Sequence, residues 1–186
     1  MHPQLETVVQ EFRAATKRLH ALVGAVPAER WDQRPEPGRW SVGECIAHLN
    51  LTAEVFLPLL DQALARARRL DGSPPRRYRR DPVGWILWRT AGPPVRHRVR
   101  TAAPFVPSGR HTPASVLVAT FDRLQGEQVR RVEAADGLPL SKVWITSPFN
   151  ARVRYNLYAC LTVLPRHEHR HLWQAEQVWT RLAAES

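Results

Sequence analysis

The chain of 186 residues contains little lysine, little cysteine and no long apolar run. Only two of its 27 lysine and arginine residues are lysines, Lys17 and Lys142. Its two cysteines, Cys45 and Cys160, are too few for a disulfide framework, so we expect reduced thiols that fill small apolar spaces. No apolar stretch approaches the ~20 residues that span a bilayer, which excludes a membrane-spanning helix.

The N-terminal residues lack the basic start and apolar core of a secretory signal. We therefore expect a cytoplasmic protein without a membrane partner. The length fits one domain, residues 1–186, and an apolar content of 44% is ordinary for a soluble fold. A formal charge of +10 would attract nucleic acid or anionic metabolites, but arginine replacing lysine on solvated surfaces explains the excess as well.

Four segments show the apolar periodicity of amphipathic helices, and no clear strand pattern accompanies them. Ser41 and Glu44 have the spacing of a capping box that begins the second helix, and Pro58 should kink that helix. Thr112 and Pro113 are typical of the N-cap and first position of the third helix. The pattern predicts an all-α four-helix bundle, with helices at about 3–26, 41–70, 112–136 and 154–184.

Residues 71–111 form an insert rich in proline, arginine and tryptophan between the second and third helices. A short loop would force these two helices to be antiparallel, whereas a connection this long lets them run parallel. Within the insert, residues 84–88 should form a short apolar helix. We expect Trp85, Ile86 and Trp88 to pack against the bundle or a second subunit, because such apolar bulk is rarely left exposed.

His167 and His171 are four residues apart in the last predicted helix, so their side chains share one face. Apolar residues continue the same stripe, which places both rings toward the interior, where an unpaired imidazole is costly. His48, on the inner face of the second helix, is the third candidate ligand. Three imidazoles with one open position suit zinc, nickel or iron, whereas a closing thiolate from Cys45 or Cys160 would indicate a structural ion.

Other polar residues could assist such a site. Glu44 lies one turn before His48 and could act as a general base, although the capping box already explains it. Gln174 follows His171 by three residues and could orient a ligand or bound water. An anionic substrate could be held by arginines of the insert, although a solvated loop is the simpler interpretation of this run: Arg76, Arg77, Arg79 and Arg80.

Two blocks resemble the DinB-like (DinB/YfiT-type) family of metal-binding four-helix bundles. They read Trp40-Ser41-Val42-Gly43-Glu44-Cys45-Ile46-Ala47-His48-Leu49 and His167-Glu168-His169-Arg170-His171-Leu172-Trp173-Gln174. The resemblance implies up-down-down-up helix order with a long crossover between helices two and three. It also implies a divalent metal, zinc or nickel most often, held by His48, His167 and His171. Relatives include thiol S-transferases and hydrolase-like proteins, and many form dimers, but the large insert departs from the family pattern.

Three functions follow from these observations. The first is a metal-dependent enzyme that activates water or a thiol for a small-molecule substrate such as an anionic thiol. The second is a nucleic-acid-binding module, because the basic insert interleaves arginines with Trp85 and Trp88, although no recognised motif supports it. The third is a bundle with a purely structural metal. We favour the enzyme, as a homodimer with at most weak nucleic-acid binding.

Overall fold

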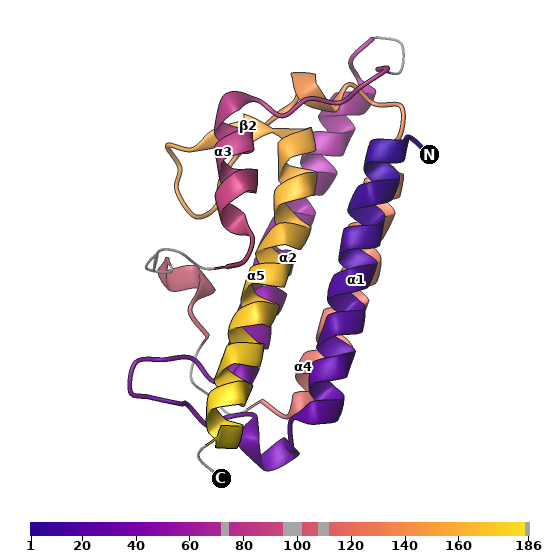
Figure 1. The fold of residues 1–186 in the computed structure, drawn as a ribbon. Coiled ribbons are helices and arrows are strands. Elements are labelled where there is room, and N and C mark those ends of the chain that lie inside the picture. The colour runs from indigo at the N-terminus through magenta and orange to yellow at the C-terminus, as the bar shows by residue number, and fades with distance from the viewer. Residues whose placement is uncertain (72–74, 95–101, 108–111, 185–186) are drawn as a thin grey trace.

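The computed structural model of the chain describes residues 1–71, 75–94, 102–107 and 112–184, and helices dominate it (Figure 1). The all-α class is confirmed. The predicted insert lies partly outside the described residues, at 72–74, 95–101 and 108–111. In chain order the elements are α1 Pro3–Ala25, η1 Ala28–Arg30, α2 Val42–Arg68, α3 Pro82–Ala91, η2 Ala103–Phe105, α4 Ala114–Glu133, η3 Leu140–Lys142, β1 Trp144–Thr146, β2 Arg154–Asn156 and α5 Leu157–Ala184.

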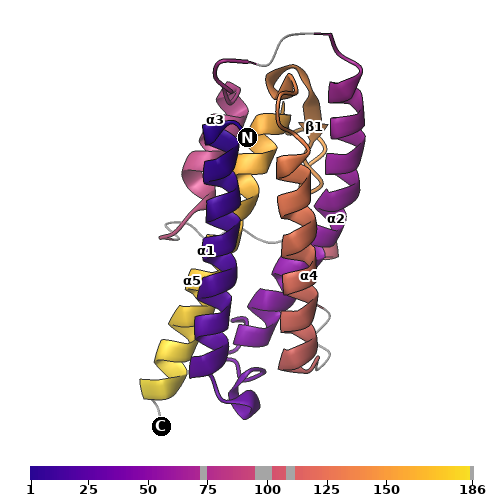
Figure 2. The ribbon, with the colours of Figure 1, turned by 90° about the vertical axis from the view of Figure 1, so that its right-hand side faces the viewer.

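Four long helices, α1, α2, α4 and α5, lie side by side (Figures 1 and 2). In Figure 1, α1 and α5 begin at the upper end, whereas α2 and α4 begin at the lower end. Helix α2 packs against α4 and α5, and α1 packs against the same two helices, so α1 and α2 lie diagonally opposite each other. Among the described residues, no helix has both the length and the apolar composition that crossing a bilayer requires.

The start of α2 follows the predicted capping box. The Ser41 hydroxyl accepts a hydrogen bond from the Glu44 backbone N–H at 3.1 Å, and the Ser41 backbone N–H donates to Glu44 Oε2 at 2.8 Å. The helix then continues through Pro58 to Arg68. The predicted cap of the third long helix is wrong, because Pro113 occupies the N-cap of α4 and no side chain caps it.

A small hairpin replaces the predicted first turn of the last helix. Strand β2 pairs antiparallel with β1, with Ile145 opposite Tyr155, and both side chains are buried. The Asn156 side-chain oxygen then accepts a hydrogen bond from the Ala159 backbone N–H at 2.8 Å, which caps α5. The burial of this cross-strand pair stabilises the strand up to Asn156. The asparagine cap then starts the helix at Leu157.

The short apolar helix predicted in the insert is α3, which packs on α5. Asp81 caps it by accepting from the Gly84 backbone N–H at 3.1 Å, and its other oxygen accepts from the Asn156 backbone N–H at 2.8 Å. A Cβ at Gly84 would lie 2.2 Å from that of Ala159, so the two helix backbones approach too closely for any other residue. Trp85 and Ile86 are 52% and 55% exposed, so the described part of the chain does not cover them.

Buried polar side chains cross the core between two apolar clusters. One cluster includes Phe12, Leu60 and Leu161, and the other includes Leu19, Ile46 and Leu172. We call the buried polar groups between them the polar belt; its members come from α2, α4 and α5 and are His48, Thr52, Gln125, Gln128, Glu168 and His171. Each belt member needs a hydrogen-bond partner or a ligand, because burial removes its water.

Glu168 is the carboxyl group of the polar belt and is only 5% exposed. Its two oxygens accept hydrogen bonds from the side-chain amides of Gln125 at 2.6 Å and Gln128 at 2.9 Å. Burial raises the pKa of Glu168 to about 8, against the opposing effect of the two amides. These hydrogen bonds join α5 to α4 across the interior.

We predict that Glu168→Ala lowers the free energy of unfolding by about 2–4 kcal/mol, because it removes an acceptor from both buried amides and leaves Gln128 only its longer bond to Gln125, at 3.4 Å. Urea unfolding of the metal-free chain measures this change. Glu168→Gln should lose much less, because its carbonyl oxygen can accept from one amide and its NH2 can donate to the other once that amide turns over. The exposed Glu54→Ala should change stability by less than about 0.5 kcal/mol, and an equal loss in that control would contradict the assignment.

Candidate metal centre

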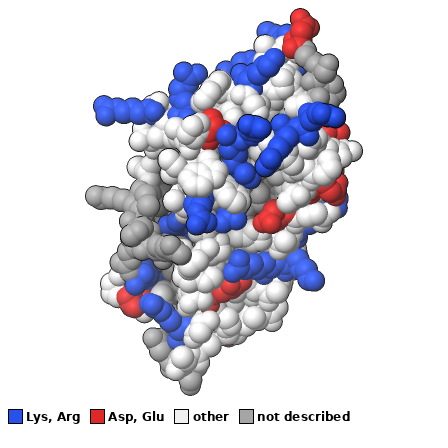
Figure 3. All heavy atoms as spheres, turned by 45° about the horizontal axis from the view of Figure 1, so that its top comes forward, with Lys and Arg blue, Asp and Glu red and all other residues white. Residues whose placement is uncertain are grey.

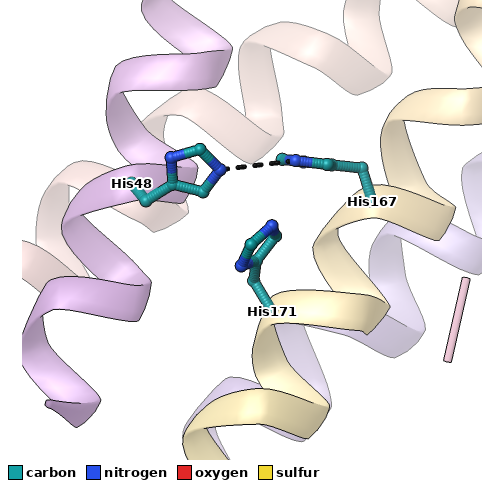
Figure 4. Close-up of side chains that lie close together, drawn as sticks. All are labelled: His48, His167 and His171. Atoms are coloured by element: carbon teal, nitrogen blue, oxygen red, sulfur yellow. Dashed lines mark hydrogen bonds between the residues drawn. The ribbon is translucent and has the colours of Figure 1, made fainter. Parts of the chain in front are cut away.

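Three histidines converge in the interior between α2 and α5 (Figure 4). His48 comes from α2, and His167 and His171 lie one turn apart on α5. One ligand nitrogen from each lies within 4.8 Å of the others, and no cysteine or carboxylate joins this group among the described residues. The predicted ligand triad is therefore assembled from two helices that contact each other along their length.

The spacing of the three rings fits a bound cation. His48 Nε2 lies 3.4 Å from His167 Nε2. Two nitrogens that bind one ion tetrahedrally, at ~2.0–2.1 Å each, are separated by about 3.3–3.4 Å. The His171 ring centroid lies 4.4 Å from that of His48 and 4.5 Å from that of His167, so the third ring closes the triangle.

A backbone carbonyl fixes the tautomer of His48. Its Nδ1–H donates to the Phe105 carbonyl oxygen at 2.7 Å, and a carbonyl can only accept. In the neutral ring, Nε2 then carries the lone pair, and Nε2 is the atom that faces His167. Phe105 belongs to η2, so a segment of the insert orients this ligand, as supporting groups commonly do at metal sites.

Burial keeps the three rings neutral. It lowers the pKa of His48, lowers that of His167 to about 3, and places that of His171 well below its usual value. The mutual repulsion of their charged forms adds to the effect at His167 and His171. Neutral imidazoles offer lone pairs to a cation, so protons compete weakly for this site at neutral pH.

His171 has an unsatisfied ring nitrogen. Its Nδ1 is buried and has no hydrogen-bond partner among the described groups. Burial has the largest effect on the His171 pKa and lowers it, whereas a side-chain hydrogen bond with Gln174 raises it. Gln174 therefore lies beside His171, and its role in orienting a ligand stays a prediction.

Aromatic side chains surround the three histidines. The Trp40 ring centroid lies 5.0 Å from that of His48 and 5.9 Å from that of His171. On another side, Phe149 lies 5.9 Å from His167 and 4.1 Å from Phe105. Together with the burial of His48 and His171, these apolar walls lower the local polarity, which strengthens electrostatic interactions at the site.

Glu44 is occupied by structural contacts. Besides the capping box, its carboxylate accepts hydrogen bonds from the Arg34 guanidinium, one of them at 2.9 Å from Nε to Oε2. Burial raises the pKa of Glu44, but the bonds from Arg34 and Ser41 outweigh burial and leave the pKa below its usual value. A carboxylate held in this way is a weak base, which agrees with the structural interpretation of Glu44.

The four arginines proposed to hold a substrate lie toward one end of the bundle. Arg76, Arg77 and Arg79 are exposed, and the Arg76 carbonyl contacts His2 before α1. Arg80 is half-buried and donates from Nε to Thr162 on α5 at 2.8 Å. Thr162 lies on the side of α5 that faces α3, whereas the two ligand histidines face α2.

Neither cysteine joins the site. Cys45 and Cys160 are buried, with 0% and 1% exposure, and both are free thiols. Burial raises the pKa of each thiol far above its usual value, and the nearby Glu44 adds to this at Cys45. The described residues therefore leave the three-histidine group without a fourth protein ligand.

The fold and the site define an all-α protein with a possible three-histidine metal centre. Comparison with protein families matches residues 11–175 to the DinB superfamily, so the chain belongs to that superfamily. Similar searches matched no curated protein and no solved structure.

The sequence pattern did not reveal three contributors to the site. The Phe105 carbonyl carries no side-chain signal, and Phe149 follows a proline in a loop between two strands that were not predicted. Trp40 was visible only as the first residue of the Trp-Ser block in the family resemblance. Contacts between segments this far apart in the chain leave no periodic pattern in the sequence.

We predict that neither cysteine of the folded chain reacts with iodoacetamide at pH 8, because both are buried and their thiolates are disfavoured. Mass spectrometry should find no adduct before unfolding and two adducts in guanidinium. Rapid labelling of either thiol in the folded chain would contradict this burial.

We predict that zinc or nickel stabilises metal-stripped protein, because a ligand that binds only the folded state shifts unfolding by mass action. At a hundredfold excess over Kd the gain is about 2.7 kcal/mol, or about 5–10 °C in Tm. His171→Ala should abolish the shift in a thermal melt. His169→Ala is the matched control, since His169 contacts Glu11 outside the cluster, and a lost response there would argue against the triad.

Proposed function

We propose that the chain is a metal-dependent enzyme in which His48, His167 and His171 hold a divalent ion, zinc or nickel. The observation that carries the proposal is the three-nitrogen cluster with no fourth protein ligand among the described residues. An all-imidazole donor set suits both ions, and a position left open is the mark of a catalytic site. When bound, the ion would lower the pKa of a water or thiol at that position.

The chain's own residues would prepare this site. The Phe105 carbonyl holds His48 in the tautomer with its lone pair on Nε2. Trp40 and Phe149 form apolar walls on two sides, and His167 is only partly buried, so a substrate can reach its side of the cluster. A small molecule with a thiol or a hydrolysable bond is the proposed substrate, in a reaction like thiol S-transfer or hydrolysis.

The two alternatives predict different observations. A purely structural ion would need a fourth protein ligand, and both cysteines lie outside the cluster. A single-strand binder would need the insert aromatics free for stacking, but the Trp88 ring is already covered by Arg80 and Arg166 at 4.2 and 4.6 Å. Trp85 remains exposed, so weak binding that salt abolishes stays our expectation for nucleic acid.

The finer architecture also belongs to this proposal. We assign the four long helices to the up-down-down-up four-helix bundle, with the crossover from α2 to α4 formed by the insert. The homodimer and the cytoplasmic location remain predictions. Both are measurable, by light scattering of the purified chain and by fractionation of the source cells.

Cobalt substitution tests the open position. We expect Co²⁺-loaded protein to show a tetrahedral absorption spectrum, and added glutathione or cysteine to introduce a thiolate-to-cobalt charge-transfer band. A thiol can add this band only by occupying a position that the protein leaves free. His171→Ala should show neither spectrum, whereas His169→Ala should show both.

The outcome decides between the enzyme and the structural ion. A cobalt spectrum that no thiol or hydroxide alters, across a pH titration, would contradict the open site. If the thiol binds, turnover of monobromobimane with glutathione, compared with turnover of p-nitrophenyl acetate, distinguishes transfer from hydrolysis.

A further inference from the structure

A pocket separate from the histidine cluster lies between α1, α3 and α5, on the side of α5 away from the three histidines. Its volume is about 270 Å³. The walls come from the first turns of α1, the first half of α5 and the Trp88 side of α3; the residues that matter are Thr7, Glu11, Arg80, Trp88, Thr162 and Arg166. Figure 3 shows many lysine and arginine side chains, in blue, across the upper part of the face that it draws.

Two arginines share the Trp88 ring in this pocket. The Arg80 guanidinium carbon lies 4.2 Å from the ring centroid and that of Arg166 lies 4.6 Å from it. Among the described residues, neither arginine forms an ion pair with a carboxylate. Two like charges on one ring without a counterion are unfavourable, so the pocket is short of negative charge.

Within the described part of the chain, one nitrogen of Arg166 also lacks a hydrogen-bond partner. Its Nε is buried and unpaired, whereas Arg80 Nε donates to the Thr162 hydroxyl at 2.8 Å. A buried donor of a charged group without an acceptor is costly. Burial lowers the pKa of Arg80, and the charge on Arg166 lowers it further, against the opposite effect of Tyr158. An oxyanion in the pocket would satisfy both needs.

The backbone at the C-terminal cap of α3 lies against Arg166. A Cβ at Gly92 would lie 2.6 Å from Arg166 Nη2 and 3.0 Å from Cζ, so the glycine backbone lies directly against the guanidinium. The flat group is thus contacted by both Trp88 and Gly92 before any ligand arrives. Such preorganisation lowers the entropic cost of binding.

Among the described residues that line the pocket, Glu11 is the one carboxylate. It is 48% exposed and contacts His169 at 3.4 Å, so it lies at the rim and is directed to another partner. The Thr7 and Thr162 hydroxyls already donate to the Pro3 and Ala159 carbonyls at 3.0 Å each, so the charge and the N–H donors near the ligand come from the two guanidinium groups. The polar groups around Arg166 therefore favour an anion over a cation.

We propose that this pocket binds a compact anionic metabolite, through a carboxylate or phosphate group held by Arg166 and Arg80. A guanidinium fork matches both oxyanions, and Trp88 supplies an apolar wall for the rest of the ligand. The volume is below the usual range for drug-sized ligands, so the ligand has few heavy atoms. This site goes beyond the proposed enzyme function and does not depend on the metal.

The test uses the full chain, stripped of metal so that no anion can bind an ion at the histidines. Inorganic phosphate and succinate are titrated separately by calorimetry at constant ionic strength. We expect saturable binding of at least one, and the tighter of the two identifies the class of group. Arg166→Gln and Arg80→Gln should each weaken that binding about tenfold or more, as for a lost charge-assisted bond.

Two further variants sharpen the test. Arg89→Gln removes the same charge from the exposed face of α3 and should leave binding unchanged. Gly92→Ala keeps both arginines but displaces the Arg166 guanidinium, so it should weaken binding although the charge is intact. If circular dichroism shows that Arg166→Gln does not fold, Arg80→Gln and Gly92→Ala carry the comparison.

Absence of saturable binding for both anions would overturn the proposal. Equal weakening by Arg89→Gln and Arg166→Gln would do so as well, because it would reduce the effect to net charge. Neither result bears on the histidine site, because the cobalt spectrum of the same variants reports that site separately.

Discussion

Burying three imidazoles between α2 and α5 is the constraint on which the interior of this protein depends. A neutral imidazole inside a protein needs a partner for each ring nitrogen, and His171 Nδ1 has none among the described groups. Other members of the polar belt have partners: Glu168 accepts from two glutamines of the belt, and His48 donates to the Phe105 carbonyl outside it. A cation among the three rings would use the lone pairs that remain.

Three consecutive residues of α5 face three different environments. Successive side chains turn by about 100° around a helix. Arg166 therefore faces α3 and its pocket, His167 faces α2 and the histidine cluster, and Glu168 faces the amides of α4. A basic pocket, a candidate metal site and a buried carboxyl group therefore lie around the same turn of α5.

The insert contributes more to the interior than its composition indicates. Its helix α3 approaches α5 at Gly84, and η2 places the Phe105 carbonyl on His48. The first contact needs a glycine, but nothing in the local sequence says which helix it approaches, and the second is made by a backbone carbonyl, which any residue at position 105 would supply. The apolar periodicity of the long helices was readable from the sequence, whereas these backbone contacts were not. The hairpin of β1 and β2 was missed for a related reason, because strands of three residues are too short to show alternation.

The sequence by itself determined the features that arise within one helix. These are the apolar stripes, the capping box at Ser41 and the i, i+4 spacing that puts His167 and His171 on one face, since helix geometry is the same wherever a helix forms. Folding in three dimensions decided which distant groups meet those faces: Phe105 at His48, Gln125 and Gln128 at Glu168, and Trp88 between two arginines of different segments. These contacts depend on how the helices pack and on the paths of the loops, so the local sequence around each residue does not predict them.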